Sequence, residues 1–266
     1  MKRFIAVVAA QLLTMTSSAS TPFWQDEFDQ PAGTGPDPAK WVHDLGDNGW
    51  GNKELQTYTD SRENSFVAAD ADATDGRALV VKARLTPTGG YTSARLKTHG
   101  KFSFRHGRIE ARLKLPQGQG IWPAFWMLGD QIDSTPWPVC GEIDIVELIG
   151  HQPGTLYGTL HGPGYSGQHG ITKSVQLPAG AKFADAYHVF AVDWRPGRIE
   201  WLLDGKIYHT LTPTDLPAGA KWVFDDISCY VLLNLAVGGL WPGYPDATTQ
   251  LPQEYRIDYV RVYRHG

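Results

Sequence analysis

The sequence predicts an all-β protein, built as a β-sandwich or jelly roll in one domain over residues 21–266. Short runs rich in β-branched and aromatic residues follow one another closely, and turns rich in glycine and proline separate them. No segment has a convincing helix signature, and we find no internal repeat or low-complexity linker. If one of the two sheets is curved, its outer face forms a concave cleft long enough for a polymer.

The expected strands follow from alternation, β-rich composition and turn signals. Residues 121–128 are almost wholly apolar, which is typical of a strand buried on both faces. Asp204 and Gly205 mark the turn of a hairpin over residues 198–210. Residues 41–59 are polar and aromatic without periodicity, so we expect a long ordered loop there. The other predicted strands are residues 78–85, 91–104, 107–115, 141–147, 155–161, 228–237 and 254–263.

Residues 1–20 have the pattern of a signal peptide. Lys2 and Arg3 form a basic start, residues 4–13 are mostly apolar, and Ser18 and Ala19 offer small side chains for cleavage. The apolar run is too short to span a bilayer, and no later stretch resembles a transmembrane segment. We therefore expect cleavage near Ala19, export from the cell and no membrane partner.

The composition favours a carbohydrate ligand over a nucleic acid. The formal net charge is −4, whereas a nucleic-acid surface needs a basic patch. The chain has 10 Trp, 11 Tyr and 10 Phe residues, and flat aromatic rings suit stacking on sugar rings. Its two cysteines, Cys140 and Cys229, can pair in an oxidising compartment or remain buried thiols.

The chemistry is concentrated in residues 141–147, which contain Glu142, Asp144 and Glu147 between aliphatic residues. In a strand, side chains alternate between the two faces, so Glu142 and Asp144 share one face. Glu147 would point to the opposite face of a regular strand. A β-bulge near residues 145–146 returns it to the face of the other two acids.

Three carboxylates on one face suit a retaining glycosidase, which needs a nucleophile and a proton donor about 5–5.5 Å apart. Crowding drives their pKa values apart, as such a pair requires, and Asp144 between them would act as a relay. The pattern also fits a solvated acidic face of an amphipathic strand, or a carboxylate metal site.

Other segments offer groups that can hold a sugar. Trp122 and Trp126 share one face and form a stacking platform, unless both belong to the core. Arg95 offers a rigid fork of donors for hydroxyl groups, although a structural ion pair is equally common. His161 lies on the strand after the acids and can equally be a structural histidine, and Asn52 lies in the loop of residues 41–59.

The run Glu-Ile-Asp-Ile-Val-Glu at residues 142–147 resembles the Glu-x-Asp-x-x-Glu signature of glycoside hydrolase family 16. It has the bulged form found in the family's laminarinases, agarases and carrageenases, rather than the shorter form of most of its lichenases. The resemblance covers nearly all of residues 21–266. The segments similar to laminarinases are residues 50–58, 93–96, 100–115, 122–128, 190–194, 234–242 and 257–263.

This resemblance implies a β-jelly roll with a catalytic cleft on its concave sheet, and retaining hydrolysis of β-glucans without a catalytic cofactor. It implies that Glu142 is the nucleophile, Glu147 the acid/base and Asp144 the assisting acid. The residues that match cleft groups of the family are Asn52, Arg95, Trp122, Trp126, Trp137, His161 and Asn234.

The resemblance also implies a structural calcium ion on the convex face. Its ligands would be the Glu27 carbonyl, the Gly76 carbonyl and the Asp258 carboxylate, an oxygen-only set that suits calcium. On its residue chemistry alone, Asp258 can equally cap a turn or pair with Arg256 or Arg261.

We therefore expect an exported, monomeric, endo-acting hydrolase of β-1,3-glucan, with mixed β-1,3/1,4-glucan as a second substrate. The alternatives are a galactan hydrolase of the agarase or carrageenase type, a transglycosylase, and a non-catalytic β-glucan-binding module. Sulfated galactans favour basic subsites, and Arg95 is the one clear basic candidate in the segments named above. A binding module would not need the two glutamates that the chain retains.

Overall fold

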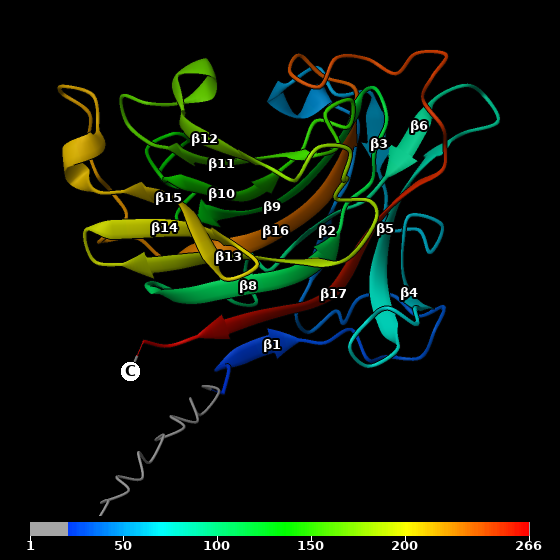
Figure 1. The fold of residues 1–266 in the computed structure, drawn as a ribbon, viewed down its shortest axis with the longest axis horizontal. Coiled ribbons are helices and arrows are strands. Elements are labelled where there is room, and N and C mark those ends of the chain that lie inside the picture. Colours follow the sequence, from blue (N-terminus) through cyan, green and yellow to red (C-terminus); the bar gives the residue numbers. More distant parts are fainter. Residues whose placement is uncertain (1–20, 266) are drawn as a thin grey trace, which may run out of the picture.

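A computed structural model describes residues 21–265, which form two packed β-sheets (Figure 1). The predicted all-β jelly roll is confirmed. One sheet has ten strands and includes the path β15-β14-β13-β8-β17-β5-β6-β3, with β1 beside β17 and β4 beside β5. The other sheet has seven strands in the order β12-β11-β10-β9-β16-β7-β2. Every strand pair is antiparallel except β3 with β6.

The strands of the ten-stranded sheet are β1 Trp24–Asp26, β3 Gln56–Tyr58, β4 Ser65–Ala69, β5 Arg77–Leu85, β6 Tyr91–Ser93, β8 Gly107–Lys114, β13 His188–Arg195, β14 Arg198–Leu203, β15 Lys206–Leu211 and β17 Gln253–Tyr263. Those of the seven-stranded sheet are β2 Val42–Asp44, β7 Arg95–Lys97, β9 Ile121–Gly129, β10 Glu142–Glu147, β11 Thr155–His161, β12 Ile171–Gln176 and β16 Cys229–Val237. The short 3-10 helices are η1 Gly49–Gly51, η2 Gly167–His169 and η3 Pro213–Asp215.

Most predicted strands lie within a residue or two of the observed ones, but the secondary structure of two segments was predicted wrongly. Residues 91–104 are not one strand, because β6 and β7 belong to different sheets and the chain crosses between the sheets at the buried Ala94. The expected loop of residues 41–59 contains η1 and two short strands, β2 and β3. Composition alone did not predict β1, β4, β12 or β13, and the exposed, polar edge strand β12 has little apolar signal to detect.

The hydrophobic core lies between the sheets, and the aliphatic side chains of the acidic strand β10 pack into it. Ile143, Ile145 and Val146 of β10 are almost fully buried in it. Each large apolar side chain buried in this way stabilises the fold by about 1.5–3 kcal/mol. Trp201 of β14, in the opposite sheet, donates a hydrogen bond from its indole Nε1 to the Asp144 carbonyl at 2.8 Å. This bond ties the acidic strand to the other layer.

Strand β9 was expected to be buried on both faces, and this was wrong for one of them. The face with Phe125 and Met127 is core, whereas Trp122 and Trp126 are only partly buried on the other face. That second face forms part of a cleft.

Cys140 and Cys229 are both buried free thiols in this structure. The predicted signal peptide, residues 1–20, lies outside the described part of the chain. Within residues 21–265, no helix has the length and apolar character that crossing a membrane requires.

Candidate active site

A bulge in β10 brings Glu142, Asp144 and Glu147 to one face, as the spacing predicted. On the neighbouring strand β11 these acids pair with the alternate residues His161, Thr159 and Tyr157. Three steps along β10, from Asp144 to Glu147, therefore match two steps along β11. The register with β9 shifts at the same place, between Asp144 and Val146. The extra residue turns Glu147 toward the other two acids.

The three carboxyl groups share a site with little positive charge. Burial raises the pKa of Glu142 to about 7, although hydrogen bonds from Asp144 and Trp137 oppose the shift. Burial and the charge of Glu142 raise the pKa of Glu147 to about 8. Burial, with the charges of Glu142 and Glu147, raises the pKa of Asp144 well above its usual range. Near neutral pH the group therefore retains protons, which a site with one acid and one ionised carboxylate requires.

His161 lies against the first two acids. Its Nε2 is 3.4 Å from Asp144 Oδ2 and 3.9 Å from Glu142 Oε1. Burial lowers the pKa of His161 to about 4, so the imidazole is neutral at pH 7. The ring of Trp137, which is 43% exposed, lies with its centroid 6.0 Å from that of His161.

Above the acids lies a cleft of about 930 Å³, and the sequence-predicted sugar-binding residues all line it. Trp122 donates a hydrogen bond from Nε1 to Glu147 Oε1 at 3.2 Å, so this indole both lines the cleft and orients a carboxyl group. The residues that line the cleft and were predicted from the sequence are Asn52, Arg95, Trp122, Trp126, Trp137, Glu142, Asp144, Glu147, His161 and Asn234.

Asn234 and Asn52 have protein partners for the groups expected to bind sugar. Asn234 accepts a hydrogen bond from Trp126 Nε1 at 2.7 Å and donates one to the Tyr58 hydroxyl at 3.2 Å. Asn52 donates to the Glu54 carboxylate at 3.1 Å, and Tyr58 donates to the same group at 3.3 Å. These residues form one network that holds Trp126 in place.

Arg95 combines both roles that its chemistry allowed. Its Nε donates to Asp44 Oδ2 at 3.0 Å, as in a structural ion pair. Its guanidinium also lies over two rings of the cleft, 4.9 Å from the centroid of Trp50 and 4.8 Å from that of Trp126. Arg95 therefore positions the aromatic wall.

Sequence reasoning missed a second aromatic group near Glu147. Trp241 is 40% exposed and meets the ring of Trp122 edge-on at 5.6 Å and that of Tyr157 at 5.1 Å. Trp241 lies in a loop after β16, so no strand alternation links it to the acids. Its place just after Gly238 and Gly239, which both have positive φ angles, was the available signal of a shaped loop.

The sequence around this site matches a known protein family. Residues 48–261 match the family described as Glycosyl hydrolases family 16. The chain belongs to this family. The resemblance seen in the sequence is thereby confirmed, and the protein is a glycoside hydrolase.

Individual proteins that are similar to this family 16 enzyme support the same assignment. A protein named "Beta-glucanase" from Rhodothermus marinus is 41% identical over 251 residues, which cover 91% of this chain and 84% of the relative. "Glucan endo-1,3-beta-glucosidase A1" from Niallia circulans is 37% identical over 91% of this chain, which spans only 37% of that protein. The crystal structure of the laminarinase catalytic domain from Thermotoga maritima has a TM-score of 0.83 at 46% identity, covering 93% of this chain and 99% of that one.

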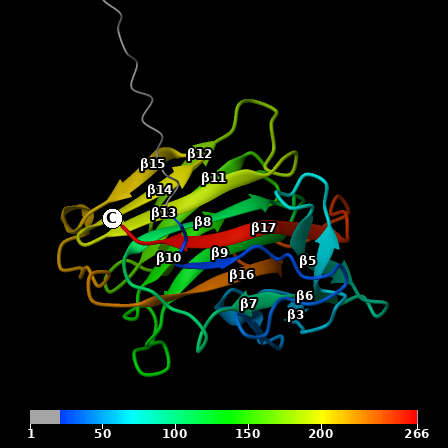
Figure 2. The same ribbon diagram turned by 90° about the horizontal axis from the view of Figure 1, so that it is seen from below.

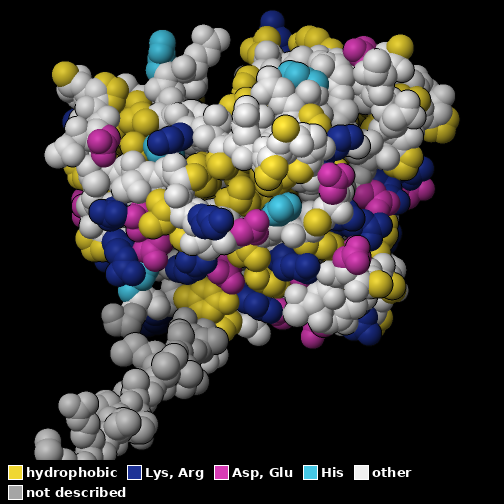
Figure 3. Space-filling view, in the orientation of Figure 1, with side chains coloured by type: hydrophobic (Ala, Val, Ile, Leu, Met, Phe, Trp, Pro, Cys, Tyr) yellow, Lys and Arg dark blue, Asp and Glu magenta, His cyan; other side chains and the backbone are white. Residues whose placement is uncertain are grey.

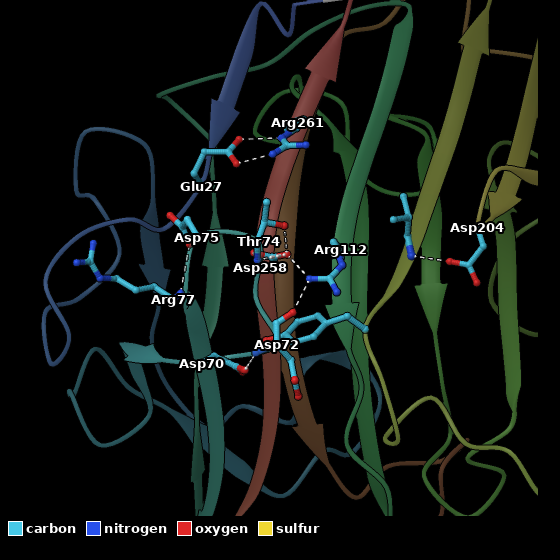
Figure 4. Close-up of polar contacts among 12 residues, drawn as sticks. Glu27, Asp70, Asp72, Thr74, Asp75, Arg77, Arg112, Asp204, Asp258 and Arg261 are labelled. Atoms are coloured by element: carbon cyan, nitrogen blue, oxygen red, sulfur yellow. Dashed lines mark hydrogen bonds and ion pairs between the residues drawn. The ribbon is translucent and has the colours of Figure 1, made fainter. Parts of the chain in front are cut away.

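The residues that carry the three predicted calcium ligands lie on or beside the ten-stranded sheet, and Figure 4 shows Glu27 and Asp258 with their side-chain partners. Asp258 is 1% exposed, and its two carboxylate oxygens accept hydrogen bonds from the Thr74 amide and hydroxyl. The carboxylate also pairs with Arg112 rather than with Arg256 or Arg261. The Gly76 carbonyl accepts the Asp70 amide at 2.9 Å.

The contacts of the Asp258 carboxylate do not fit a calcium site. A guanidinium beside the carboxylate repels a dication, and both carboxylate oxygens already accept hydrogen bonds. The Glu27 side chain accepts two hydrogen bonds from Arg261, at 2.8 and 2.7 Å, but the predicted ligand was the Glu27 carbonyl, which these bonds leave free. The arrangement is that of a capped turn held by ion pairs.

Proposed function

We propose that this family 16 hydrolase is an endo-acting β-1,3-glucanase, with mixed β-1,3/1,4-glucan as a second substrate, and that it works by retaining double displacement. One observation carries the mechanism: Glu142, Asp144 and Glu147 face one cleft, and the pKa of each carboxyl group is raised. The relatives named for β-glucan and endo-1,3-β-glucan activity support the substrate.

In the first step, Glu147 is the general acid. Its raised pKa keeps it protonated near neutral pH, and the Trp122 indole holds its carboxyl group. It gives its proton to the glycosidic oxygen as the bond from that oxygen to the anomeric carbon breaks. The leaving sugar departs with a new hydroxyl group.

Glu142 is the nucleophile of the same step. Because Glu147 and Asp144 hold the protons, Glu142 is the group that ionises. Its carboxylate attacks the anomeric carbon and forms a glycosyl-enzyme ester. Asp144, in its protonated form, donates a hydrogen bond to Glu142 and stabilises the developing charge.

In the second step, Glu147 acts as the base. Now ionised, it takes a proton from a water molecule, whose oxygen attacks the anomeric carbon and releases Glu142 as a carboxylate. Two inversions at one carbon retain the configuration. A transglycosylase would use a sugar hydroxyl in place of this water.

The charge of the cleft favours a neutral glucan over a sulfated galactan. Among the described residues that line it, Arg95 is the only arginine or lysine, and Asp44 already pairs with its guanidinium. A sulfated polymer would leave its charges without partners here. Several tryptophans line the same cleft, and this suits uncharged pyranose rings.

Export and a monomeric state are part of the same proposal. The basic, apolar and small-residue pattern of residues 1–20 supports export, and a polymeric substrate outside the cell requires it. N-terminal sequencing of the secreted protein tests the cleavage near Ala19. Sedimentation of the mature protein tests the monomer.

The deciding experiment measures reducing-sugar release and product sizes on laminarin, lichenan, agarose and κ-carrageenan. Wild type is compared with Glu142→Gln and with a control variant, Glu63→Gln, whose glutamate is exposed and pairs with Arg84. We expect mid-chain cleavage of laminarin, lost by at least about 10³-fold in Glu142→Gln and unchanged in the control. Early products observed by proton NMR should keep the β configuration.

Each other outcome would overturn a different part of the proposal. Cleavage of a galactan instead of laminarin would overturn the substrate and keep the mechanism. Products longer than the substrate would indicate a transglycosylase. Binding to laminarin without any cleavage would indicate a binding module, and normal activity of Glu142→Gln would overturn the assignment of the nucleophile.

A further inference from the structure

Glu142, Asp144 and His161 form a cluster, and the proposed mechanism gives no role to His161. One potential ligand atom from each residue lies within 4.8 Å of the other two. The two separations involving His161 Nε2 are 3.4 Å to Asp144 Oδ2 and 3.9 Å to Glu142 Oε1. Ligand atoms around a tetrahedral zinc ion are about 3.3 Å apart. A rotation of the Glu142 side chain toward the other two residues would complete the ligand triangle.

Asp144 supplies an independent sign that a ligand fits here. Its side chain is 5% exposed, and Oδ2, the carboxylate oxygen that pairs with His161 Nε2, is buried without a hydrogen-bond partner in the described structure. A buried polar atom without a partner is costly. Across residues 21–265, neither Glu142 nor Asp144 forms an ion pair with an arginine or a lysine. A cation bound between them would satisfy the free oxygen and relieve the repulsion between the carboxyl groups.

We propose that Glu142, Asp144 and His161 bind a transition-metal dication such as Zn²⁺, and that the bound ion inhibits the enzyme. The imidazole ligand selects ions of this type over Ca²⁺ and Mg²⁺, which take oxygen ligands. Three protein ligands leave a fourth position, open to the cleft, for water. The ion coordinates the Glu142 carboxylate, which then cannot attack the sugar. Binding rests on the geometry alone, whereas the inhibition rests on the proposed role of Glu142.

A second histidine with nearby acids serves as the control. His99 Nε2 is 3.9 Å from both Asp130 Oδ1 and Asp133 Oδ2, but Asp133 is 86% exposed. Exposed carboxylates on loops are mobile and solvated, so they hold an ion weakly. Substitution of His99 therefore removes a histidine of similar chemistry from outside the cleft.

The test is calorimetric titration of ZnCl₂ into wild type, His161→Asn, Asp144→Asn and His99→Asn, each first checked for an unchanged thermal melt. We expect one site in wild type and in His99→Asn. Loss of a direct ligand should weaken binding by at least about tenfold, in His161→Asn and in Asp144→Asn alike. Binding that is absent from wild type, or undiminished in a folded His161→Asn, would overturn the site.

Initial rates on laminarin test the inhibition separately. ZnCl₂ should abolish hydrolysis by wild type at concentrations that fill the calorimetric site, EDTA should restore it, and MgCl₂ at equal concentration should have no effect. Full activity with the site filled would overturn the inhibition. If the protein did not hydrolyse laminarin at all, the proposed function would fail, and the titration would still decide the metal site.

Discussion

The two sheets carry acidic residues in opposite electrostatic settings. On the seven-stranded sheet, Glu142, Asp144 and Glu147 face one another, and the pKa of each is raised. At the end of β4 in the ten-stranded sheet, burial opposes ionisation of Asp70, but hydrogen bonds from Arg256 and Tyr187 outweigh it and lower its pKa. In the same way, Lys82 and Arg256 lower the pKa of Glu254 against the effect of burial.

The difference shows that partners, not residue type, decide what a carboxyl group does. Basic and acidic side chains are interspersed over the face along β8, β13 and β14 of the ten-stranded sheet (Figure 3). Figure 2 shows the same three strands from below. Paired acids there stabilise the fold. The acids of the cleft lack such pairs, so they cost stability and retain the protons that catalysis needs.

Replacing an acid on each sheet gives the sharpest contrast. Asp144→Asn should lower kcat on laminarin by about 10²-fold, because Glu142 loses its charge-tuning neighbour. Asp70→Asn, just after β4 of the other sheet, should leave kcat within about twofold. Steady-state kinetics of both variants measures this. Equal losses of kcat would mean that the two sheets do not differ in function.

Asp258→Asn should show the reverse behaviour. The substitution leaves Arg112 without its ionised partner, and we expect a loss of about 2 kcal/mol in the free energy of unfolding, since Arg112 is partly exposed and solvent compensates in part. Urea unfolding measures the loss, and KM for laminarin should not change. A fully stable Asp258→Asn would show that this pair contributes nothing.

Removing a cleft acid should stabilise the protein at high pH. The pKa of Glu147 is about 8 in the folded protein and near 4.5 in the unfolded chain. The folded state therefore binds more protons between these values, and its stability falls as pH rises from 4.5 to 8. Glu147→Gln should be about 1 kcal/mol more stable than wild type at pH 8 and no more stable at pH 4. Urea unfolding at both pH values checks this, and equal differences would contradict it.

The smallest effect should come from Trp241, which has no charge to contribute. Trp241→Ala should raise KM for long laminarin oligosaccharides about threefold and leave kcat unchanged, because it removes a stacking surface near Glu147. Leu85→Ala, at an exposed apolar position on β5, is the matched control. A fall in kcat instead would place Trp241 among the residues that orient the acid.

Short-range patterns predicted the acidic strand, and long-range contacts explain what was missed. Alternation and one extra residue sufficed to place Glu142, Asp144 and Glu147 on one face, because both act within a few residues. The link from Trp126 through Asn234 to Tyr58 depends on how distant strands align. No local pattern determines that register, nor does one place the Trp241 loop beside Tyr157.

The hydrogen bond from Trp201 to the Asp144 carbonyl has a consequence for how this enzyme can evolve. The shape of the catalytic strand depends on a side chain contributed by the other layer, 57 residues away in the chain. A substitution at Trp201 would alter chemistry without touching the substrate. Selection for activity therefore also constrains Trp201 in the opposite sheet, and the sequences of the two sheets cannot diverge independently.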